Sequence, residues 1–375
     1  MQYSAAANKY FPQFVKQFEA KNKGIHVNLR VIDWTQGHQV IGTEIGGGNP
    51  PDVAIIGTRW LPEYVSNGLL VPLDKLMSSS FRSQYYKVPL DSVKYQGKKY
   101  ALPEAMSVRL LLYNKSLFKK AGISSPPKTW TQLAKDAVQI HKKTGQSGYG
   151  LVGSQVETEL AFFEPMWGFG GDILHGKQGA LTSKQDIAAL QFLVNLIKQG
   201  GTEKAVTSST RVSLENQFAA GKLAMMIDGP WLVNSARSNH VSVATANVPA
   251  QPGVKQRNPA ITDSMVMFKG KNQSASWKFM QFMFSKTVRT TFDKTEGMLP
   301  TMKIVGTEKQ FASSPIFGPY LKALQRPAVF EPVVAKFDTI ALAVSDAVQA
   351  AYSGGASPAD ALARANSKVT DALSK

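Results

Sequence analysis

The sequence predicts an α/β protein made of two lobes, and three observations point to that class. The chain has 375 residues, a length at which a single hydrophobic core usually stops growing and a second domain is expected. Segments with the apolar spacing of helices alternate with short apolar runs typical of buried strands, which predicts parallel sheets covered by helices on both faces. No run of 18 or more apolar residues occurs in the sequence, so no segment of it is predicted to span a membrane as a helix.

The N-terminal part is predicted to form a helix followed by two strands. Apolar residues at i, i+3, i+4 and i+7 form one helical face: Phe11, Phe14, Val15 and Phe18. Segment 25–31 alternates apolar and polar residues, as a half-buried strand does. After a glycine-rich loop, the apolar run 52–57 predicts a buried parallel strand.

Capping residues and turn signals predict three later helices and one further strand. Residues 129–132 form a capping box, in which the first and last side chains each reach the other's backbone amide. Ser183 caps a second helix, which a glycine pair at 200–201 ends. Pro358 stands at the first position of the last helix. The apolar run 223–229 is typical of a short buried strand.

The chain is strongly basic. Lys and Arg together number 43 against 26 Asp and Glu, a net charge of +17. Such an excess raises nucleic-acid binding as a hypothesis, but the basic residues are spread along the whole chain and cluster only as pairs such as Lys98-Lys99. We therefore expect no nucleic-acid partner. The charge indicates a cationic surface suited to an anionic wall or membrane face, or to an acidic habitat.

The sequence lacks the motifs of catalysis and metal binding. It has no cysteine, which excludes disulfides, thiolate metal sites and cysteine nucleophiles. It contains no G-x-S-x-G, H-E-x-x-H or G-x-x-x-x-G-K-[ST] motif, and its five histidines are scattered. We therefore expect no catalytic residue, no metal and no cofactor. Two carboxylates that meet in space, as in glycosidases, remain the enzymatic alternative.

Tryptophans carry the clearest functional signal. Four of the six follow strand-like runs in turn-rich segments: Trp34, Trp60, Trp167 and Trp231. In open parallel sheets, ligands bind at the carboxyl ends of the strands. Indole rings stack on the apolar faces of sugars, while Asp, Glu and Arg hydrogen-bond the hydroxyls. The pattern therefore predicts a carbohydrate site. The alternative is that these side chains fill the core, as we expect for Trp130 and Trp277 on helix patterns.

Short motifs stand in a fixed order along nearly the whole chain: PDVA (51–54), GLLVPLD (68–74), YALP (100–103), LYNKSLFKKAG (112–122), PKTW (127–130), GGDIL (170–174), FAAGKLAM (218–225), DGPW (228–231) and GMLPT (297–301). In this order and spacing they resemble the extracellular solute-binding proteins of bacterial ABC sugar importers, of the maltose- and trehalose-binding type. The resemblance implies a periplasmic-binding-protein-like fold, with two α/β lobes joined by crossover strands around a ligand cleft.

The resemblance also implies where the lobes divide. The N-terminal lobe comprises residues 1–108 plus 264–299, and the C-terminal lobe comprises residues 109–263 plus 300–375. Crossings between the lobes are expected near residues 107–113, 258–265 and 297–302. Family members begin with a strand ahead of the first helix, and here only residues 1–3 correspond to it. The N-terminus also lacks the basic and apolar regions of a signal peptide.

Ten positions are implied to bind the ligand: Asp33, Trp34, Arg59, Trp60, Glu104, Arg109, Glu164, Trp167, Trp231 and Asp263. The residues around Glu104 and Asp263 depart from the family pattern. Arg109 is a further departure, because an arginine near the hinge suits an anionic ligand as well as a sugar.

The implied function is that of the substrate-binding component of an ATP-driven carbohydrate importer. Such a protein is a monomer that captures a small oligosaccharide by hinge closure and docks on the permease subunits of the importer. It is extracellular, either as a lipoprotein anchored to the cell surface or in the periplasm. Arg59 and Arg109 keep an anionic ligand open, such as glycerol phosphate or a uronic-acid sugar. A glycosidase-like enzyme is the more distant alternative.

Overall fold

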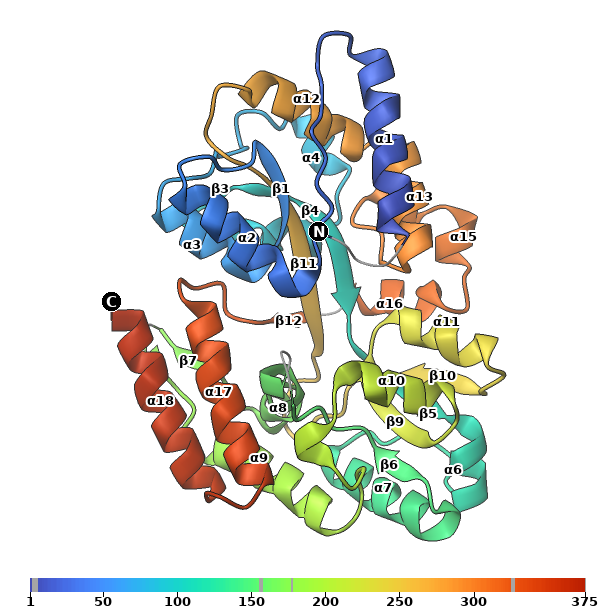
Figure 1. Ribbon diagram of the computed structural model, residues 1–375. Helices are drawn as coiled ribbons and strands as arrows, with labels where there is room; N and C mark the ends of the chain where they lie inside the picture. The colour runs from blue at the N-terminus through green and yellow to red at the C-terminus, as the bar shows by residue number, and fades with distance from the viewer. Residues whose placement is uncertain (2–5, 155–157, 177, 325–327, 375) are drawn as a thin grey trace. The chain divides into compact units, whose positions relative to one another are not determined.

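The chain forms two compact units. The computed structural model describes residues 1, 6–154, 158–176, 178–324 and 328–374. Unit 1 comprises Met1–Ser107, Ile261–Leu321 and Val333–Ala335, and unit 2 comprises Val108–Ala260, Lys322–Pro332 and Lys336–Lys375. Each unit contains its own sheet and helices (Figure 1). No helix in the described ranges is long and apolar enough to cross a membrane.

Unit 1 is built on strand β11 (Asn258–Met267), which enters it from unit 2. β1 (Val53–Gly57) pairs antiparallel with β11, in a register from Val53 opposite Met267 to Gly57 opposite Asp263. β4 (Ala101–Val108) also pairs with β11. A separate antiparallel pair is formed by β2 (Lys94–Tyr95) and β3 (Lys98–Lys99).

The helices of unit 1 are α1 (Ala7–Lys21), α2 (Trp34–Gly46), a 3₁₀ turn η1 (Thr58–Trp60), α3 (Leu61–Ser66), α4 (Ser79–Ser83), α5 (Lys87–Ser92), α12 (Gln273–Met283), α13 (Lys286–Glu296), α14 (Lys303–Gly306), α15 (Lys309–Ala312) and α16 (Phe317–Ala323). The predicted first helix is confirmed as α1. Its apolar stripe is buried in the core, where the ring of Phe18 lies 5.1 Å from that of Phe279.

The prediction of a strand at 25–31 is wrong, because this segment lies outside the sheets that the described residues form. A strand needs a neighbour with which to exchange backbone hydrogen bonds. A cavity of about 590 Å³ is lined by this segment on one side and by residues 49–55, including β1, on the other. The backbone N–H of Val27 instead donates to Glu19 Oε1 at 2.8 Å. Residues 2 and 3, part of the expected remnant of a first strand, lie outside the described residues.

Unit 2 is built on a sheet with the strand order β10–β5–β9–β6. Its strands are β5 (Leu110–Asn114), β6 (Ser147–Tyr149), β9 (Leu223–Asp228) and β10 (Val243–Ala246). β7 (Leu174–His175) pairs with β8 (Gln178–Gly179), and β12 (Ala328–Phe330) runs parallel to the first residues of β11. The predicted strand at 223–229 is confirmed as β9, and all of its residues are buried.

The helices of unit 2 are α6 (Lys115–Ala121), α7 (Trp130–Thr144), α8 (Thr158–Phe169), α9 (Lys184–Lys198), the 3₁₀ turn η2 (Val206–Ser208), α10 (Arg211–Ala219), α11 (Pro230–Ser238), α17 (Phe337–Tyr352) and α18 (Pro358–Ser374). α17 and α18 pack side by side as the last pair of helices (Figure 1).

The sheets are mixed, which corrects the prediction of parallel sheets. β1 pairs antiparallel with β11, and β5 pairs antiparallel with both β9 and β10. Only β6 with β9 and β12 with β11 are parallel among the described pairs. The alternation of helices and strands does not by itself fix the direction of pairing: several helices lie between β5 and β9 along the chain, and the two strands nevertheless pair antiparallel.

The predicted helix caps are confirmed. Thr129 accepts a hydrogen bond from the Gln132 backbone N–H at 3.1 Å, and Ser183 accepts one from that of Asp186 at 3.1 Å. The capping box at α7 differs in one bond, because Gln132 Oε1 accepts from the backbone N–H of Lys128 rather than Thr129. The glycine expected to end α9 has a φ of +72°, a left-handed conformation that a helix terminus uses.

Residues 300–321 belong to unit 1, whereas the predicted division assigned them to the C-terminal lobe. Met302 forms an antiparallel bridge with Tyr85, and the carbonyl of Thr301 accepts from the backbone N–H of Tyr86 at 3.0 Å. Buried apolar residues of the following short helices join the core of unit 1. These pairings join residues far apart in sequence, so no local sequence pattern predicts that the segment belongs to unit 1.

A buried ion network lies on β4 and α13 of unit 1. The Arg289 guanidinium donates to Glu104 Oε1 at 2.9 Å, to the Glu104 carbonyl, and to Asp293 Oδ1 at 2.6 Å. All three side chains are at most 1% exposed. Removing one partner from such a network leaves a buried charge without compensation, which costs far more than losing an exposed pair.

We predict that Arg289→Met lowers the free energy of unfolding by about 3–5 kcal/mol, because both carboxylates then lack their cation. Lys286→Met is the matched control: Lys286 lies on the same helix, is half exposed, and pairs with Glu308 at 3.2 Å, so we expect a loss of at most about 1 kcal/mol. Urea unfolding of the two variants measures both values. Equal losses would contradict a buried network.

A second prediction concerns Glu203, which is buried in unit 2. Burial raises its pKa from 4.5 to about 7. Between those values the folded protein holds a proton that the unfolded chain has lost, so stability falls as pH rises from about 4.5 to about 7, by on the order of 3 kcal/mol. Glu203→Gln should flatten this part of a curve of unfolding free energy against pH. A variant curve with the wild-type slope would show that other groups cause the dependence.

Candidate functional site

In unit 1, an aromatic cluster forms where β1 ends. η1 follows β1 directly and buries Trp60, while Trp34 is the first residue of α2. The two indole rings lie 5.9 Å apart, with an angle of 53° between their planes. The guanidinium carbon of Arg59 lies 5.5 Å from the centre of the Trp60 ring, within cation–π range. Three predicted ligand residues thus meet in one cluster.

His38 belongs to the same cluster and was not predicted. Its ring stacks on Trp60, with centroids 4.5 Å apart and planes 8° apart, and its Nε2 lies 3.2 Å from Glu63 Oε2. His38 follows Trp34 by one helical turn, so the two share a face of α2. That spacing is visible in the sequence, but the contact of α2 with η1, which stacks His38 on Trp60, is decided by tertiary structure.

The two predicted aspartates of unit 1 differ in setting. Asp33 is exposed just before α2, and its carbonyl accepts from the Gln36 backbone N–H at 3.1 Å. Asp263 is partly exposed on β11, directly opposite Gly57. Because Gly57 ends β1, this register brings Asp263 to the strand end that η1 follows.

Glu104 does not join that cluster. Its carboxylate is fully buried and accepts from Arg289, as described above. A carboxylate held in a buried ion network serves the packing of β4 on α13. No sequence pattern predicts this pairing, because Arg289 lies 185 residues from Glu104 along the chain.

In unit 2, Arg109 is buried between strands and pairs with Asp228, the last residue of β9. The second oxygen of Asp228 lies 3.4 Å from the guanidinium of Arg211, at the start of α10. Asp228 Oδ1 also accepts from the backbone N–H of Gly229 at 2.7 Å. The positive charge of Arg109 is therefore balanced within its own unit.

Trp231 lies beside this ion cluster. The guanidinium carbon of Arg109 is 4.8 Å from the centre of the Trp231 ring, and the indole N–H donates to Glu215 Oε1 at 2.9 Å. The ring folds back over Gly229: a Cβ added there would lie 2.1 Å from a ring carbon. The indole is thus held at its face, its N–H and its benzo edge.

Burial raises the pKa of Glu215 to about 7, and the neighbouring Asp228 carboxylate acts in the same direction. The Trp231 N–H and Arg211 act against both. Glu215 was missed by the sequence reasoning, because its link to Trp231 joins two helices. Only its spacing of one helical turn from Arg211 was visible in the sequence.

Glu164 and Trp167 lie within α8, not in a loop after a strand, which corrects the expected setting of Trp167. All residues of α8 from Thr158 to Gly168 are buried, so this apolar segment forms a helix packed on all sides. The Trp167 ring lies 5.6 Å from that of Phe163. The structure therefore joins Arg109 with Trp231 and keeps Glu164 and Trp167 on another element.

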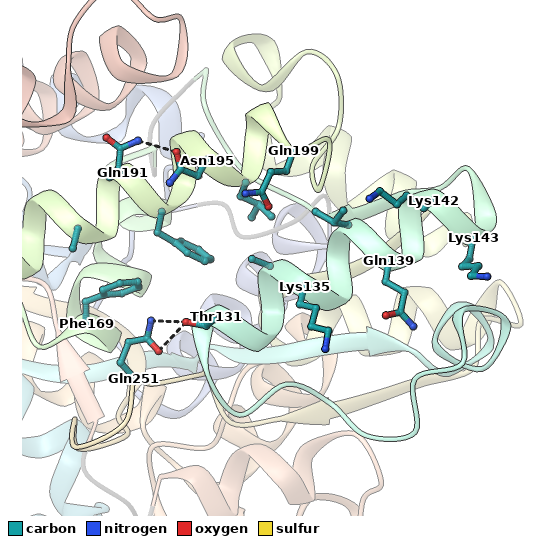
Figure 2. Close-up of a pocket in the computed structure, with 15 residues that line it drawn as sticks. Thr131, Lys135, Gln139, Lys142, Lys143, Phe169, Gln191, Asn195, Gln199 and Gln251 are labelled. Carbon is teal, nitrogen blue, oxygen red and sulfur yellow. Dashed lines mark hydrogen bonds between the residues drawn. The ribbon is translucent and has the colours of Figure 1, made fainter.

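The described residues include no group of three or more His, Cys, Asp or Glu side chains that could hold a metal ion. Unit 2 also has an open groove of about 960 Å³ between α7 and α9 (Figure 2). Its described charged lining consists of lysines (Lys135, Lys142 and Lys143), beside amides such as Gln191, which donates to Asn195 at 2.9 Å. None of the ten predicted residues lines it, so the strand-end clusters remain the candidate site.

We predict that Gly229→Ala displaces the Trp231 ring, because the added Cβ and the indole cannot occupy the same space. The expected outcome is a changed near-UV circular dichroism spectrum and a loss of about 1–3 kcal/mol in unfolding free energy. Gly42→Ala is the control, since a Cβ there meets nothing within 4 Å and the position is helical. Wild-type spectrum and stability in the Gly229 variant would disprove the packing described.

The chain is similar in sequence to known binding proteins. The profile of the bacterial extracellular solute-binding proteins matches residues 4–290. A binding protein of Brucella abortus (strain 2308) is 35% identical over 380 residues, an alignment that covers 100% of this chain and 92% of that protein. The maltotriose-binding protein of Pyrococcus abyssi is 24% identical over 294 residues, covering 75% of this chain and 61% of that protein.

Solved structures share the fold. The GacH receptor of Streptomyces glaucescens, known unliganded and with acarbose, superposes with a TM-score of 0.86 at 24% identity, over 99% of this chain and 96% of that one. Maltose-bound MalE3 of T. maritima superposes with a TM-score of 0.85 at 23% identity, over 98% of this chain and 96% of that one. The predicted fold class is thereby confirmed. A profile match over most of the sequence, together with a full-length relative at 35% identity, shows that the chain belongs to the bacterial extracellular solute-binding proteins, a family of binding proteins rather than enzymes.

Proposed function

We propose that this protein captures a small neutral oligosaccharide and delivers it to the permease subunits of an ATP-driven importer. The observation that carries the proposal is an aromatic cluster in each unit that combines indole with arginine: Trp34 and Trp60 with Arg59 in unit 1, and Trp231 with Arg109 in unit 2. Indole faces bind the apolar faces of sugars, and polar neighbours bind the hydroxyls. Relatives bound to acarbose and maltose support this ligand class.

The state of Arg109 favours a neutral ligand over an anionic one. An anion would need a cation that is not already matched. Arg109 is 3% exposed and pairs with Asp228, so recruiting it would leave that carboxylate buried without its partner, at a cost of several kcal/mol. The anionic alternative thereby loses the support of Arg109.

Within the proposed site, we assign direct contact with the sugar to the partly or fully exposed members: Asp33, Trp34, Arg59, Trp231 and Asp263. Trp60 and Arg109 support the rings of Trp34 and Trp231 from the buried side. Glu104, Glu164 and Trp167 are buried, and we assign them to packing.

The proposed mechanism is hinge closure. The chain passes between the units within β4, within β11 and again after Leu321, and we assign the hinge to β4 and β11. A ligand that contacts both units binds the closed form better and shifts the population toward it by that difference in affinity. The protein acts outside the cell as a monomer, anchored to the cell surface or in the periplasm, and its positive charge helps hold it near an anionic envelope.

We predict that neutral oligosaccharides of two or three units, such as maltose or maltotriose, raise the melting temperature. A ligand at 100 times its dissociation constant adds about 2.7 kcal/mol. Glycerol phosphate and glucuronides form the competing arm of the same melting screen. A rise with the anions alone would contradict the neutral assignment, and a rise with a sugar that is then hydrolysed would contradict simple binding.

The same screen tests the two aromatic clusters. Trp34→Ala and Trp231→Ala should each weaken binding of the stabilising sugar about tenfold, the loss expected for one stacking ring. Trp277→Ala serves as the control, because Trp277 lies on α12 and packs against Phe81 of α4, outside both clusters. Calorimetric titration gives the three dissociation constants. Equal constants for all three variants and the wild type would remove the clusters from the site.

A further inference from the structure

Trp231 is held by contacts from three residues of unit 2 on α10, between β4 and β5, and just before α11. Glu215 of α10 accepts its indole N–H at 2.9 Å, Arg109 covers its ring face at 4.8 Å, and Gly229 leaves the space into which its benzo edge folds. Its ring is nevertheless only partly buried. A large side chain that stays partly exposed usually samples several rotamers, so three fixed contacts at such a position need an explanation.

The contacts of Trp231 are themselves fixed by the ion cluster beneath it. Arg109 is anchored by Asp228, and Asp228 also binds Arg211 at 3.4 Å and the Gly229 N–H at 2.7 Å. Glu215 faces Asp228, Trp231 and Arg211, which lies one turn earlier on its own helix. Every group that touches the indole is thus held by a second partner in the described part of unit 2.

We propose that Glu215 and Arg109 are positioning residues that hold the Trp231 ring in one orientation before any ligand arrives, so that it is a preformed stacking surface for a sugar. This inference rests on the proposed function and adds to it which residues prepare the platform. A side chain that is already ordered loses less conformational entropy when the ligand binds, which is worth about three- to tenfold in affinity.

Glu215 also makes the platform sensitive to pH. A carboxylate is a stronger acceptor for the indole N–H than a neutral carboxyl, and the pKa of Glu215 is raised to about 7 by burial and by Asp228. Above that pH the Trp231 hydrogen bond is charge-assisted, and below it the bond weakens. We therefore expect ligand affinity to rise by a few-fold from pH 6 to pH 8, in parallel with the ionised fraction of Glu215.

The test records the six indole N–H resonances of the ¹⁵N-labelled full chain from pH 5.5 to 8.5 without ligand, and Trp231→Phe identifies the Trp231 peak. We expect this peak to titrate with a midpoint near pH 7. In Glu215→Gln, which keeps a neutral oxygen acceptor, the peak should lie near its low-pH position and stop titrating. In Glu215→Leu, it should move to the position of an indole without this bond at every pH.

Binding of maltotriose is then measured for the same variants. Glu215→Gln should bind a few-fold more weakly than the wild type at pH 8 and show no pH dependence, and Glu215→Leu should bind about tenfold more weakly. Exposed Asn216→Ala on the same helix should match the wild type. The positioning role is overturned if the Trp231 peak of the wild type does not titrate and the peak of Glu215→Leu stays at the wild-type position. It is also overturned if the peak of Glu215→Leu shifts while the affinity of that variant stays unchanged. A wild type that binds no neutral sugar contradicts the proposed function instead, and the titration still decides whether Glu215 positions the ring.

Discussion

Two buried arginine–carboxylate pairs hold the segment that leads from unit 1 into unit 2 at β4, and the Trp231 cluster depends on the second of them. Glu104 lies on β4 and pairs with Arg289 in unit 1, while Arg109 follows β4 immediately and pairs with Asp228 in unit 2. Each pair ties the connecting strand to the interior of one unit. Buried ion pairs add little net stability, but breaking one is costly, so they penalise any other register of the segment.

The second pair also determines what the site can bind. Because Asp228 matches the charge of Arg109, the arginine can lie against an aromatic ring without presenting a bare cation to a ligand. An indole with a cation at one face and an acceptor at its N–H is rigid and still offers apolar surface. In unit 1 the Trp60 ring is held differently: Arg59 lies at cation–π distance from it and the His38 ring stacks on it.

Strand ends explain why both clusters form where they do. β1 is followed at once by η1, and β9 is followed by Gly229 and the first turn of α11. A helical turn that begins directly after a strand presents its first side chains at the edge of the sheet, which is where ligands of such sheets are bound. Gly229 is required there for a steric reason, since any Cβ would collide with Trp231.

Local chemistry made much of the fold predictable from sequence. The stripe of α1, the caps Thr129 and Ser183, and the buried strand β9 depend on residues within a few positions of one another. The positions of Trp60 and Trp231 near strand ends followed from the same kind of pattern, although both lie in helical turns rather than loops. The strand expected before Trp34 is absent from the sheets of the described residues. Where a residue's neighbours in space are also its neighbours in sequence, propensity and spacing were sufficient.

Other features were decided only by contacts between distant parts of the chain. The direction of β11 against β1, the exclusion of segment 25–31 from a sheet and the place of residues 300–321 in unit 1 all depend on which backbones meet. The roles of Glu104 and Glu215 depend on Arg289 and Trp231, which no spacing in the sequence links to them. The sequence by itself determined the helices, the capped turns and the residue types of a sugar site. Tertiary structure decided strand pairing and charge pairing, because a backbone hydrogen bond or a buried charge is satisfied by whichever partner folding brings near it.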